Sequence, residues 1–318
     1  MINSSVAISR RRFLATTVVA SAAAWLDPRT LRAQGPPAPE DFLTKARAAN
    51  ANNKITATPL RRDVTFLAGA GGNIAVLTTK QGKLIVDSGY VSCQRQLTAA
   101  LAAINGDPIR ILVNTHWHFD HTDGNEWMHT AGATILAHEN TRYRMSTTQN
   151  IVAYKAIIPP APNGALPTVL FNSYRKLSDG TTTIMFTHYD PAHTDTDLSV
   201  HFTEANILHC GDTFWNGLYP FIDYSSGGNI NGMIVATEQN LAIAADDTII
   251  IPGHGPLGNK AHLTEFRDML VGSRDNVAKL KKEGKSLDET IAAKPTASFD
   301  EKFGKKPEAF IGYVYQGV

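Results

Sequence analysis

Residues 115–121 read Thr-His-Trp-His-Phe-Asp-His, a segment that places four metal-binding side chains close together: His116, His118, Asp120 and His121. Neutral imidazole nitrogens and carboxylate oxygens suit zinc or another first-row metal. A close-packed loop cannot easily bend all four groups onto one tetrahedral centre, so the spacing favours two adjacent metal centres. The alternative is a polar loop that is rich in histidine by chance, and the rest of the chain decides between the two.

Three later motifs supply that context. His193 lies in the segment 191–195, Asp212 in 209–213 and His254 in 251–255. Each segment follows an apolar run that predicts a buried strand, at residues 183–186, 207–209 and 248–251. Ligands on short loops at strand ends are how a rigid sheet builds a metal site, so the later motifs favour the metal interpretation.

These seven positions, in this order, resemble the signature of the metallo-β-lactamase superfamily over roughly residues 60 to 260. The resemblance implies one metal held by His116, His118 and His193. It implies a second metal held by Asp120, His121 and His254, with Asp212 bridging the two. It also matches Asp87 to an early aspartate at a strand end, which contacts a metal ligand and orients it without binding the metal.

The coarse pattern of the chain is α/β. Apolar runs predict strands at residues 64–66, 73–79, 83–87, 109–114, 133–137, 182–187, 198–202, 206–210 and 248–251. Helical spacing predicts helices at residues 41–50, 94–104, 232–244 and 260–283. Strand clusters separated by helices imply two sheets with helices packed outside. The resemblance gives this arrangement a form, a four-layer αβ/βα sandwich of two mixed sheets with the metals along one open edge.

The chain divides into four predicted parts. Residues 1–33 resemble a twin-arginine export signal, because Arg10, Arg11 and Arg12 precede a short apolar stretch. An uncleaved anchor is the alternative for this segment. Residues 34–60 form a Pro-rich tether and a short helix, and residues 61–284 form the hydrolase domain. Residues 285–318 form an extension packed on that domain, expected as a short helix followed by an extended tail.

Charge and composition limit the partners. The net charge is +1, and without the five arginines and one aspartate of residues 1–33 it becomes −3. A mildly acidic mature protein argues against nucleic acid or an anionic membrane surface as partner. No stretch after the signal is apolar enough to cross a membrane. We therefore expect a small-molecule substrate and a periplasmic or otherwise exported location; the oligomeric state stays open.

Two segments are expected to shape specificity. Residues 154–171 contain four prolines and cannot form a regular helix or a central strand. Trp117 and the segment after Asp212 supply aromatic side chains for an apolar pocket over the metals, and the pocket candidates are Trp117, Trp215, Tyr219 and Phe221. The alternative is that these rings only cap the core under a long loop.

The expected chemistry follows from the metals. Two zinc ions sharing a hydroxide would open an ester, lactone or β-lactam bond, with Asp120 as the catalytic residue that orients the hydroxide. Iron or manganese remains possible in place of zinc. An aspartate at position 212 is typical of the superfamily's lactonases and thioesterases, whereas its dedicated β-lactamases generally carry Cys or Ser there.

Three alternatives stay open. One is a mononuclear iron enzyme like the persulfide dioxygenases, and another is a thioesterase like glyoxalase II. The last is a non-catalytic binding module, which would not need a site with open coordination positions.

Overall fold

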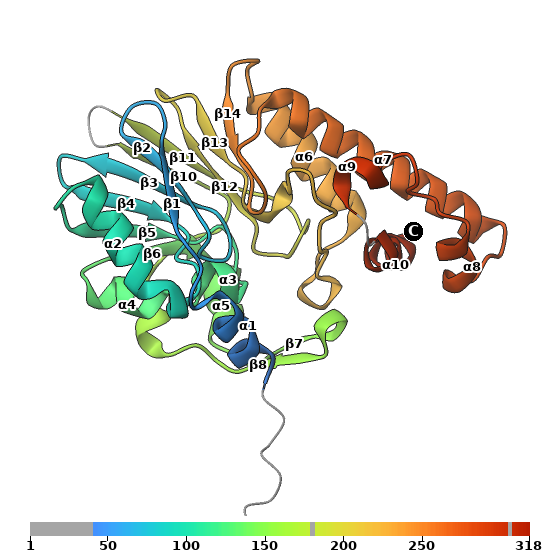
Figure 1. The fold of residues 1–318 in the computed structure, drawn as a ribbon, viewed down its shortest axis with the longest axis horizontal. Helices are drawn as coiled ribbons and strands as arrows, with labels where there is room; N and C mark the ends of the chain where they lie inside the picture. The colour runs from blue at the N-terminus through green and yellow to red at the C-terminus, as the bar shows by residue number, and fades with distance from the viewer. Residues whose placement is uncertain (1–40, 179–181, 305–306) are drawn as a thin grey trace, which may run out of the picture. The chain divides into compact units, whose positions relative to one another are not determined.

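The computed structural model describes residues 41–178, 182–304 and 307–318. The predicted export signal at residues 1–33 and the first part of the predicted tether lie outside the described residues. Within the described part, the chain builds a seven-stranded sheet, a five-stranded sheet and a separate two-stranded hairpin (Figure 1).

The seven-stranded sheet has the order β1-β2-β3-β4-β5-β6-β9. Strands β1 to β4 pair antiparallel, and β4, β5, β6 and β9 pair parallel, so the sheet is mixed. Its members are β1 (Thr56–Pro59), β2 (Val64–Ala68), β3 (Ile74–Thr79), β4 (Gly82–Val86), β5 (Ile109–Val113), β6 (Thr134–His138) and β9 (Val169–Phe171).

The five-stranded sheet has the order β10-β11-β12-β13-β14, with its last pair parallel and the others antiparallel. Its members are β10 (Tyr174–Ser178), β11 (Thr183–His188), β12 (Leu198–Phe202), β13 (Ile207–His209) and β14 (Ile249–Ile251). The hairpin pairs β7 (Gln149–Ile151) with β8 (Ala156–Ile158) across a short turn that includes η2 (Val152–Tyr154).

The described helices are α1 (Phe42–Asn50), α2 (Gln94–Ile104), α3 (Phe119–Thr122), α4 (Asn125–Thr130), α5 (Glu139–Met145), α6 (Ile230–Ile243), α7 (Lys260–Lys282), α8 (Leu287–Ala292), α9 (Asp300–Phe303) and α10 (Pro307–Gly317). Local signals explain where several begin. The Asp41 carboxylate caps α1 by accepting from the Thr44 amide at 2.7 Å, and Asn259 caps α7 by accepting from the His262 amide at 3.0 Å.

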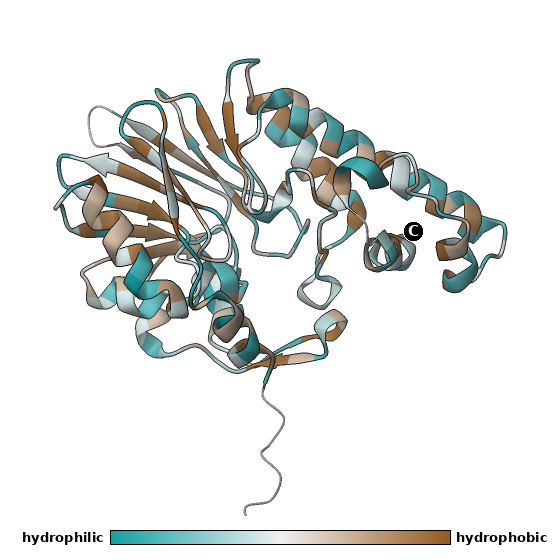
Figure 2. Cartoon of the chain, in the orientation of Figure 1, coloured by the Kyte–Doolittle hydropathy of each residue, from teal (hydrophilic) through white to brown (hydrophobic). Residues whose placement is uncertain are grey.

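Side-chain alternation along the strands builds the layers. In β14, Ile251 points into the core between the sheets, whereas Ile250 points to the outer core beneath α6 and α7. In β4, Val86 points between the sheets and Ile85 packs toward Leu97 of α2. Figure 2 shows hydrophobic residues concentrated on these strands. The expected four-layer αβ/βα sandwich with two mixed sheets is confirmed.

The C-terminal residues differ from the expectation. Instead of one short helix and an extended tail, residues 285–318 contain α8, α9 and α10. Pro307 occupies the first position of α10, where its fixed φ suits a helix and its missing amide hydrogen costs nothing. Phe310, Ile311 and Val314 then lie on one face of α10, buried in the outer core. None of the described helices is long and apolar enough to cross a membrane.

The topology gathers loops at one sheet edge. Parallel neighbours end at the same edge, so the loops after β4 and β5 lie close together, as do the loops after β13 and β14. These loops carry Asp87, the segment 115–121, Asp212 and His254.

Candidate metal centre

The loop after β5 is held in shape by Asp87. Its carboxylate accepts from the Thr115 amide at 2.8 Å and from the Thr115 hydroxyl at 2.7 Å. It also lies 2.7 Å from Nδ1 of His121, so one buried carboxylate fixes both ends of the segment 115–121. Between these ends the chain turns into α3, which places Asp120 and His121 on one helical turn. This is the orienting role expected for Asp87.

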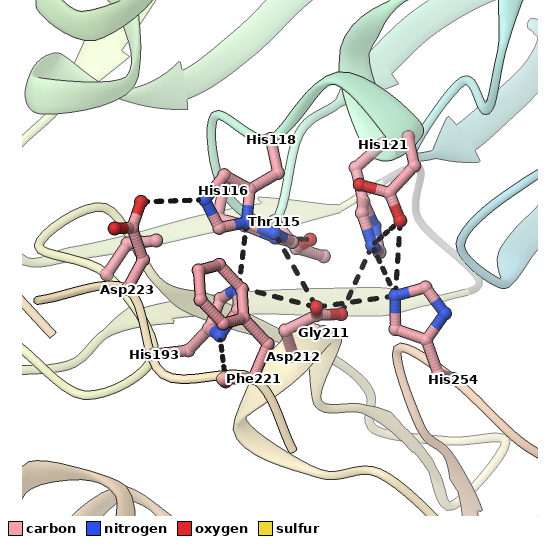
Figure 3. Close-up of polar contacts among 12 residues, drawn as sticks. Thr115, His116, His118, His121, His193, Gly211, Asp212, Phe221, Asp223 and His254 are labelled. Atoms are coloured by element: carbon pink, nitrogen blue, oxygen red, sulfur yellow. Dashed lines mark hydrogen bonds and ion pairs between the residues drawn. The ribbon is translucent and has the colours of Figure 1, made fainter. Parts of the chain in front are cut away.

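Four predicted ligands form the first group: His116, His118, His193 and Asp212 have candidate ligand atoms within 4.8 Å of one another. The Nδ1 atom of His118 lies 2.8 Å from Nε2 of His193, which in turn lies 3.4 Å from Oδ2 of Asp212. All four residues are buried, and Figure 3 shows them converging from three separate loops.

The other three form the second group: Asp120, His121 and His254 also lie within 4.8 Å of one another. Nε2 of His254 is 3.2 Å from Oδ2 of Asp120 and 3.3 Å from Oδ2 of Asp212. Nε2 of His121 is 3.1 Å from Oδ1 of Asp212. Asp212 therefore faces both groups, in the position expected of a bridging carboxylate (Figure 3).

The outward nitrogens of four histidines are tied to the protein, so each inner nitrogen faces its group. Nδ1 of His116 lies 3.0 Å from the Thr115 hydroxyl, and Nδ1 of His193 lies 2.8 Å from the Phe221 carbonyl. Nε2 of His118 lies 3.1 Å from Asp223, and His121 contacts Asp87 as above. Partners of this kind fix the tautomer and direction of metal-binding imidazoles.

Sequence reasoning missed the role of Asp223. It lies within the aromatic segment after Asp212, and its partner His118 is 105 residues away in the chain. Ser225 and Ser226 donate to its carboxylate, which stays in place beside the His118 ring. These hydrogen bonds and the contact with His118 outweigh burial and hold the pKa of Asp223 below its usual range.

The residues present fit metal ions. Among the described residues, nothing partners the buried Nε2 atom of His116, which faces Asp212 at 3.8 Å. An unpaired buried nitrogen is costly unless something binds it. Two neighbouring glycines also leave room for the groups, because a Cβ at Gly72 would strike the His121 ring and one at Gly253 would strike Asp212.

The electrostatics point the same way. Burial raises the pKa of Asp120, but His121 and His254 outweigh it and hold the pKa at about 2. Burial lowers the pKa of His254, whereas Asp212 and Asp120 raise it to about 9. In the protein alone, protons on these histidines balance the carboxylates. Bound cations would supply that positive charge instead.

Comparison with protein-family models identifies the superfamily of this chain. The model of the metallo-beta-lactamase superfamily matches residues 68–254, a stretch that contains all seven clustered side chains. The chain belongs to the metallo-beta-lactamase superfamily. Membership confirms the family suggested by the residue pattern.

Two curated relatives within this superfamily are hydroxyacylglutathione hydrolases. The protein of Polaromonas sp. is 28% identical over 173 residues, covering 54% of this chain and 58% of that protein. The protein of Nitrosococcus oceani is 30% identical over 173 residues, covering 53% and 57%. The chain thus spans a little more than half the length of these relatives.

Solved structures share the fold of this chain. The sec-alkylsulfatase Pisa1 from Pseudomonas sp. matches with a TM-score of 0.62 and 17% identity, covering 86% of this chain and 51% of that chain. The DIM-1 metallo-beta-lactamase matches with a TM-score of 0.55 and 21% identity, covering 68% and 97%.

The expected pocket residues divide in two. Trp215 and Phe221 line a cavity together with clustered residues of both groups. Trp117 does not line that cavity; it is buried, and its indole donates to the Ser226 hydroxyl. Tyr219 also lies outside it, because its hydroxyl donates to Asp300 at 2.7 Å and its ring stacks on Phe310.

Other histidines stand apart from the metal groups. His209 lies 3.1 Å from the Asn73 carbonyl, a contact that gives it a structural role. His188 stacks on His138, with 3.6 Å between ring centroids.

Proposed function

We propose that this chain is a metal-dependent hydrolase that holds two zinc ions and opens an ester, lactone or β-lactam bond. The observation that carries the proposal is the position of Asp212, whose carboxylate faces histidines of both groups: Oδ2 lies 3.4 Å from His193 of the first group, and Oδ1 lies 3.1 Å from His121 of the second. A site for one ion would not require the second group. His116, His118, His193 and Asp212 would hold one ion, and Asp120, His121, His254 and Asp212 would hold the other.

Bound at these groups, two ions would make a nucleophile from water near neutral pH and polarise the carbonyl under attack. The chain's own side chains would orient the attacking water and keep bulk water away from the site. The Asp120 carboxylate lines the cavity, and with its pKa at about 2 it stays ionised and can accept a hydrogen bond from the attacking water. Trp215 and Phe221 cover the site with apolar surface, which limits access of bulk water.

Neither cysteine of the chain is suited to act as a nucleophile. Both cysteines, Cys93 and Cys210, are free and buried. Burial raises the pKa of the Cys210 thiol, so it carries no thiolate to attack a substrate.

A thioesterase is the second candidate. The two curated relatives are named for the hydrolysis of hydroxyacylglutathione, and each matches about half of the chain. A thioester is opened by the same attack on a carbonyl, so one assay series covers both candidates.

The test is elemental analysis of the purified protein, run beside hydrolysis of a chromogenic β-lactam, a lactone, an aryl ester and a hydroxyacylglutathione. We expect two zinc ions per chain with turnover, and the ranking of rates selects the substrate bond. One iron per chain without hydrolysis would contradict the proposal and favour the dioxygenase alternative.

Variants sharpen this test. Asp212→Ala should lower zinc content and kcat/KM together, the latter by about a hundredfold or more, because the residue serves both groups. The control is Asp246→Ala, which changes an exposed carboxylate far along the chain and should leave both values unchanged. Two zinc ions and full activity in Asp212→Ala would show that the site lies elsewhere.

We further propose that residues 1–33 direct export by the twin-arginine route. The support is the sequence pattern at Arg10, Arg11 and Arg12 before an apolar stretch. Fractionation of cells that express the full chain and a variant with these arginines changed to lysine tests it.

A further inference from the structure

The cavity over the clustered residues is small. Its volume is 140 Å³, and its lining residues outside the two metal groups are Phe42, Tyr90, Phe119, Ile151, Tyr154, Trp215 and Phe221. A cavity of roughly 150 Å³ with apolar walls takes up a molecule the size of benzene. The space therefore suits a group about the size of one ring, and bound ions would reduce the space further.

The cavity's walls are aromatic rings from distant parts of the chain. Phe42 of α1 stacks on Tyr154 of the β7–β8 hairpin, with centroids 5.2 Å apart and planes at 10°. Tyr154 contacts Phe221 at 4.6 Å, and Phe42 contacts Phe119 edge-on at 5.5 Å. Trp215 closes another side, 4.3 Å from the His254 ring. Rings packed in this way present flat apolar faces to a bound group.

The cavity also lacks the long cationic side chains that bind anionic substrates. Within residues 41–178, 182–304 and 307–318, neither lysine nor arginine lines it. Arg47 and Arg144 line a different cavity, and each is already paired with a carboxylate, Asp123 and Asp195 respectively.

The surroundings of the site are acidic instead. Asp120 and Asp212 line the cavity, and the buried carboxyls of Asp87, Asp197 and Asp223 lie behind the ligand loops. Bound ions would offset the charges of Asp120 and Asp212, but a substrate carboxylate held among the aromatic rings, away from the ions, would lose its hydration without gaining a lysine or arginine partner.

We propose that the substrate is a small uncharged ester or lactone whose bound part is an aromatic ring or a flat apolar group of similar size. This inference rests on the proposed hydrolase function and narrows it. The same features disfavour substrates whose carboxylate would have to lie among these rings, away from the ions.

The first experiment compares three acetate esters on the zinc-loaded protein. Phenyl acetate and methyl para-acetoxybenzoate are neutral, and para-acetoxybenzoate carries one carboxylate at the position of the methyl ester. We expect kcat/KM for the carboxylate to be at least about tenfold below that of its methyl ester. Equal values for that pair would overturn the proposal, because the two esters are similar in size and the methyl ester also has the better leaving group, so both effects should favour it.

A charge-introducing variant provides the second test. Tyr154→Arg places a cation in the cavity wall, at a side chain that is already partly exposed. It should raise kcat/KM for para-acetoxybenzoate relative to the methyl ester by about tenfold. The matched control is Tyr143→Arg on α5, an exposed tyrosine outside the cavity, which should leave the ratio unchanged. A ratio that shifts equally in both variants would contradict the proposal.

Binding separates this inference from the proposed function. The amide analogues methyl para-acetamidobenzoate and para-acetamidobenzoate resist hydrolysis, and calorimetry gives their Kd values on the same protein. Tighter binding of the neutral amide supports the assigned cavity even if no ester turns over, a result that would count against the hydrolase alone. Tighter binding of the anion would overturn the inference whatever the hydrolysis assays give.

Discussion

At the scale of single residues, His118 depends on contacts made with both of its ring nitrogens. Nδ1 faces His193 inside the first group, and Nε2 lies 3.1 Å from Asp223. A carboxylate at Nε2 keeps the proton there and leaves Nδ1 free to bind a cation. Asp223 thus acts through His118 and does not itself reach the cluster of ligand atoms.

This arrangement predicts that Asp223→Asn weakens zinc binding. The amide keeps the size of the side chain but loses the charge that favours the correct tautomer of His118. We expect zinc affinity to fall by about 10- to 100-fold, with kcat falling alongside it. Competition against a chromogenic chelator measures the affinity.

Asp190→Asn is the matched control for this substitution, because Asp190 is exposed and lies on the loop that leads to His193. Its affinity for zinc should equal that of the unchanged protein. Equal affinity in Asp223→Asn as well would show that the Asp223 contact does not position His118.

The sequence predicts the members of the cluster better than their supports. His116, His193 and Asp212 follow apolar strands or sit in a dense motif, and such local patterns are visible without a structure. Asp223 has no comparable signal, because its partner is remote and its neighbours are aromatic. Tyr219 shows the opposite error. The sequence predicts it in the pocket because it is an aromatic residue close to Asp212, but its hydroxyl reaches Asp300 and its ring lies outside the cavity.

At the scale of elements, a histidine stack joins the two sheets. His138 ends β6 of the seven-stranded sheet, and His188 ends β11 of the five-stranded sheet. Their rings lie 3.6 Å apart with planes at 12°. Burial, followed by the neighbouring His138, lowers the pKa of His188 from 6.5 to about 4.

The lowered pKa predicts acid destabilisation. Between pH 6.5 and about 4 the unfolded chain binds more protons at His188 than the folded chain does. The contribution of this group is therefore fully present above pH 6.5 and is lost as pH falls through that window. The midpoint of urea unfolding should therefore fall as the pH falls from 6.5 to about 4.

His188→Asn tests this prediction, because the amide can still donate to the Asp197 carbonyl that Nδ1 of His188 contacts at 2.8 Å. The variant should show a flatter decline of the urea midpoint across the same window. His129→Asn, which removes a histidine outside the stack, should leave the slope unchanged. If the urea midpoint of His188→Asn declines as steeply as that of the unchanged protein, other groups determine the loss of stability at low pH.

Predicting elements from the sequence worked where the pattern was strong. Predicted and observed bounds agree for α2, where Leu97 and Leu101 are buried at helical spacing, and for β12, which is buried along nearly its whole length. Strand β1 was missed because all four of its residues are exposed, so no alternation marks it. Strand β9 lies in the proline-rich segment at a sheet edge, where a proline nearby does not interrupt the ladder.

At the scale of the whole molecule, the proposed metal site links the two sheets. The segment 115–121 and Asp87 extend from the seven-stranded sheet, whereas His193, Asp212 and His254 extend from the five-stranded sheet. Ions held by both sets would fasten the halves of the sandwich across their shared edge. Any ligand that binds only the folded state stabilises that state.

Removal of metal should therefore lower the stability of the entire fold, not only its activity. With zinc held at about a hundred times its Kd, each of the two ions contributes about 2.7 kcal/mol, so the pair contributes about 5 kcal/mol, or a shift of roughly 10–20 °C in Tm. Thermal melts with and without a chelator measure the shift. In Asp212→Ala the chelator should change Tm much less, because that variant has already lost the shared ligand. A chelator effect of the same size in both proteins would mean that zinc stabilises the fold from another place, and no effect in either would mean that the two sheets hold together without it.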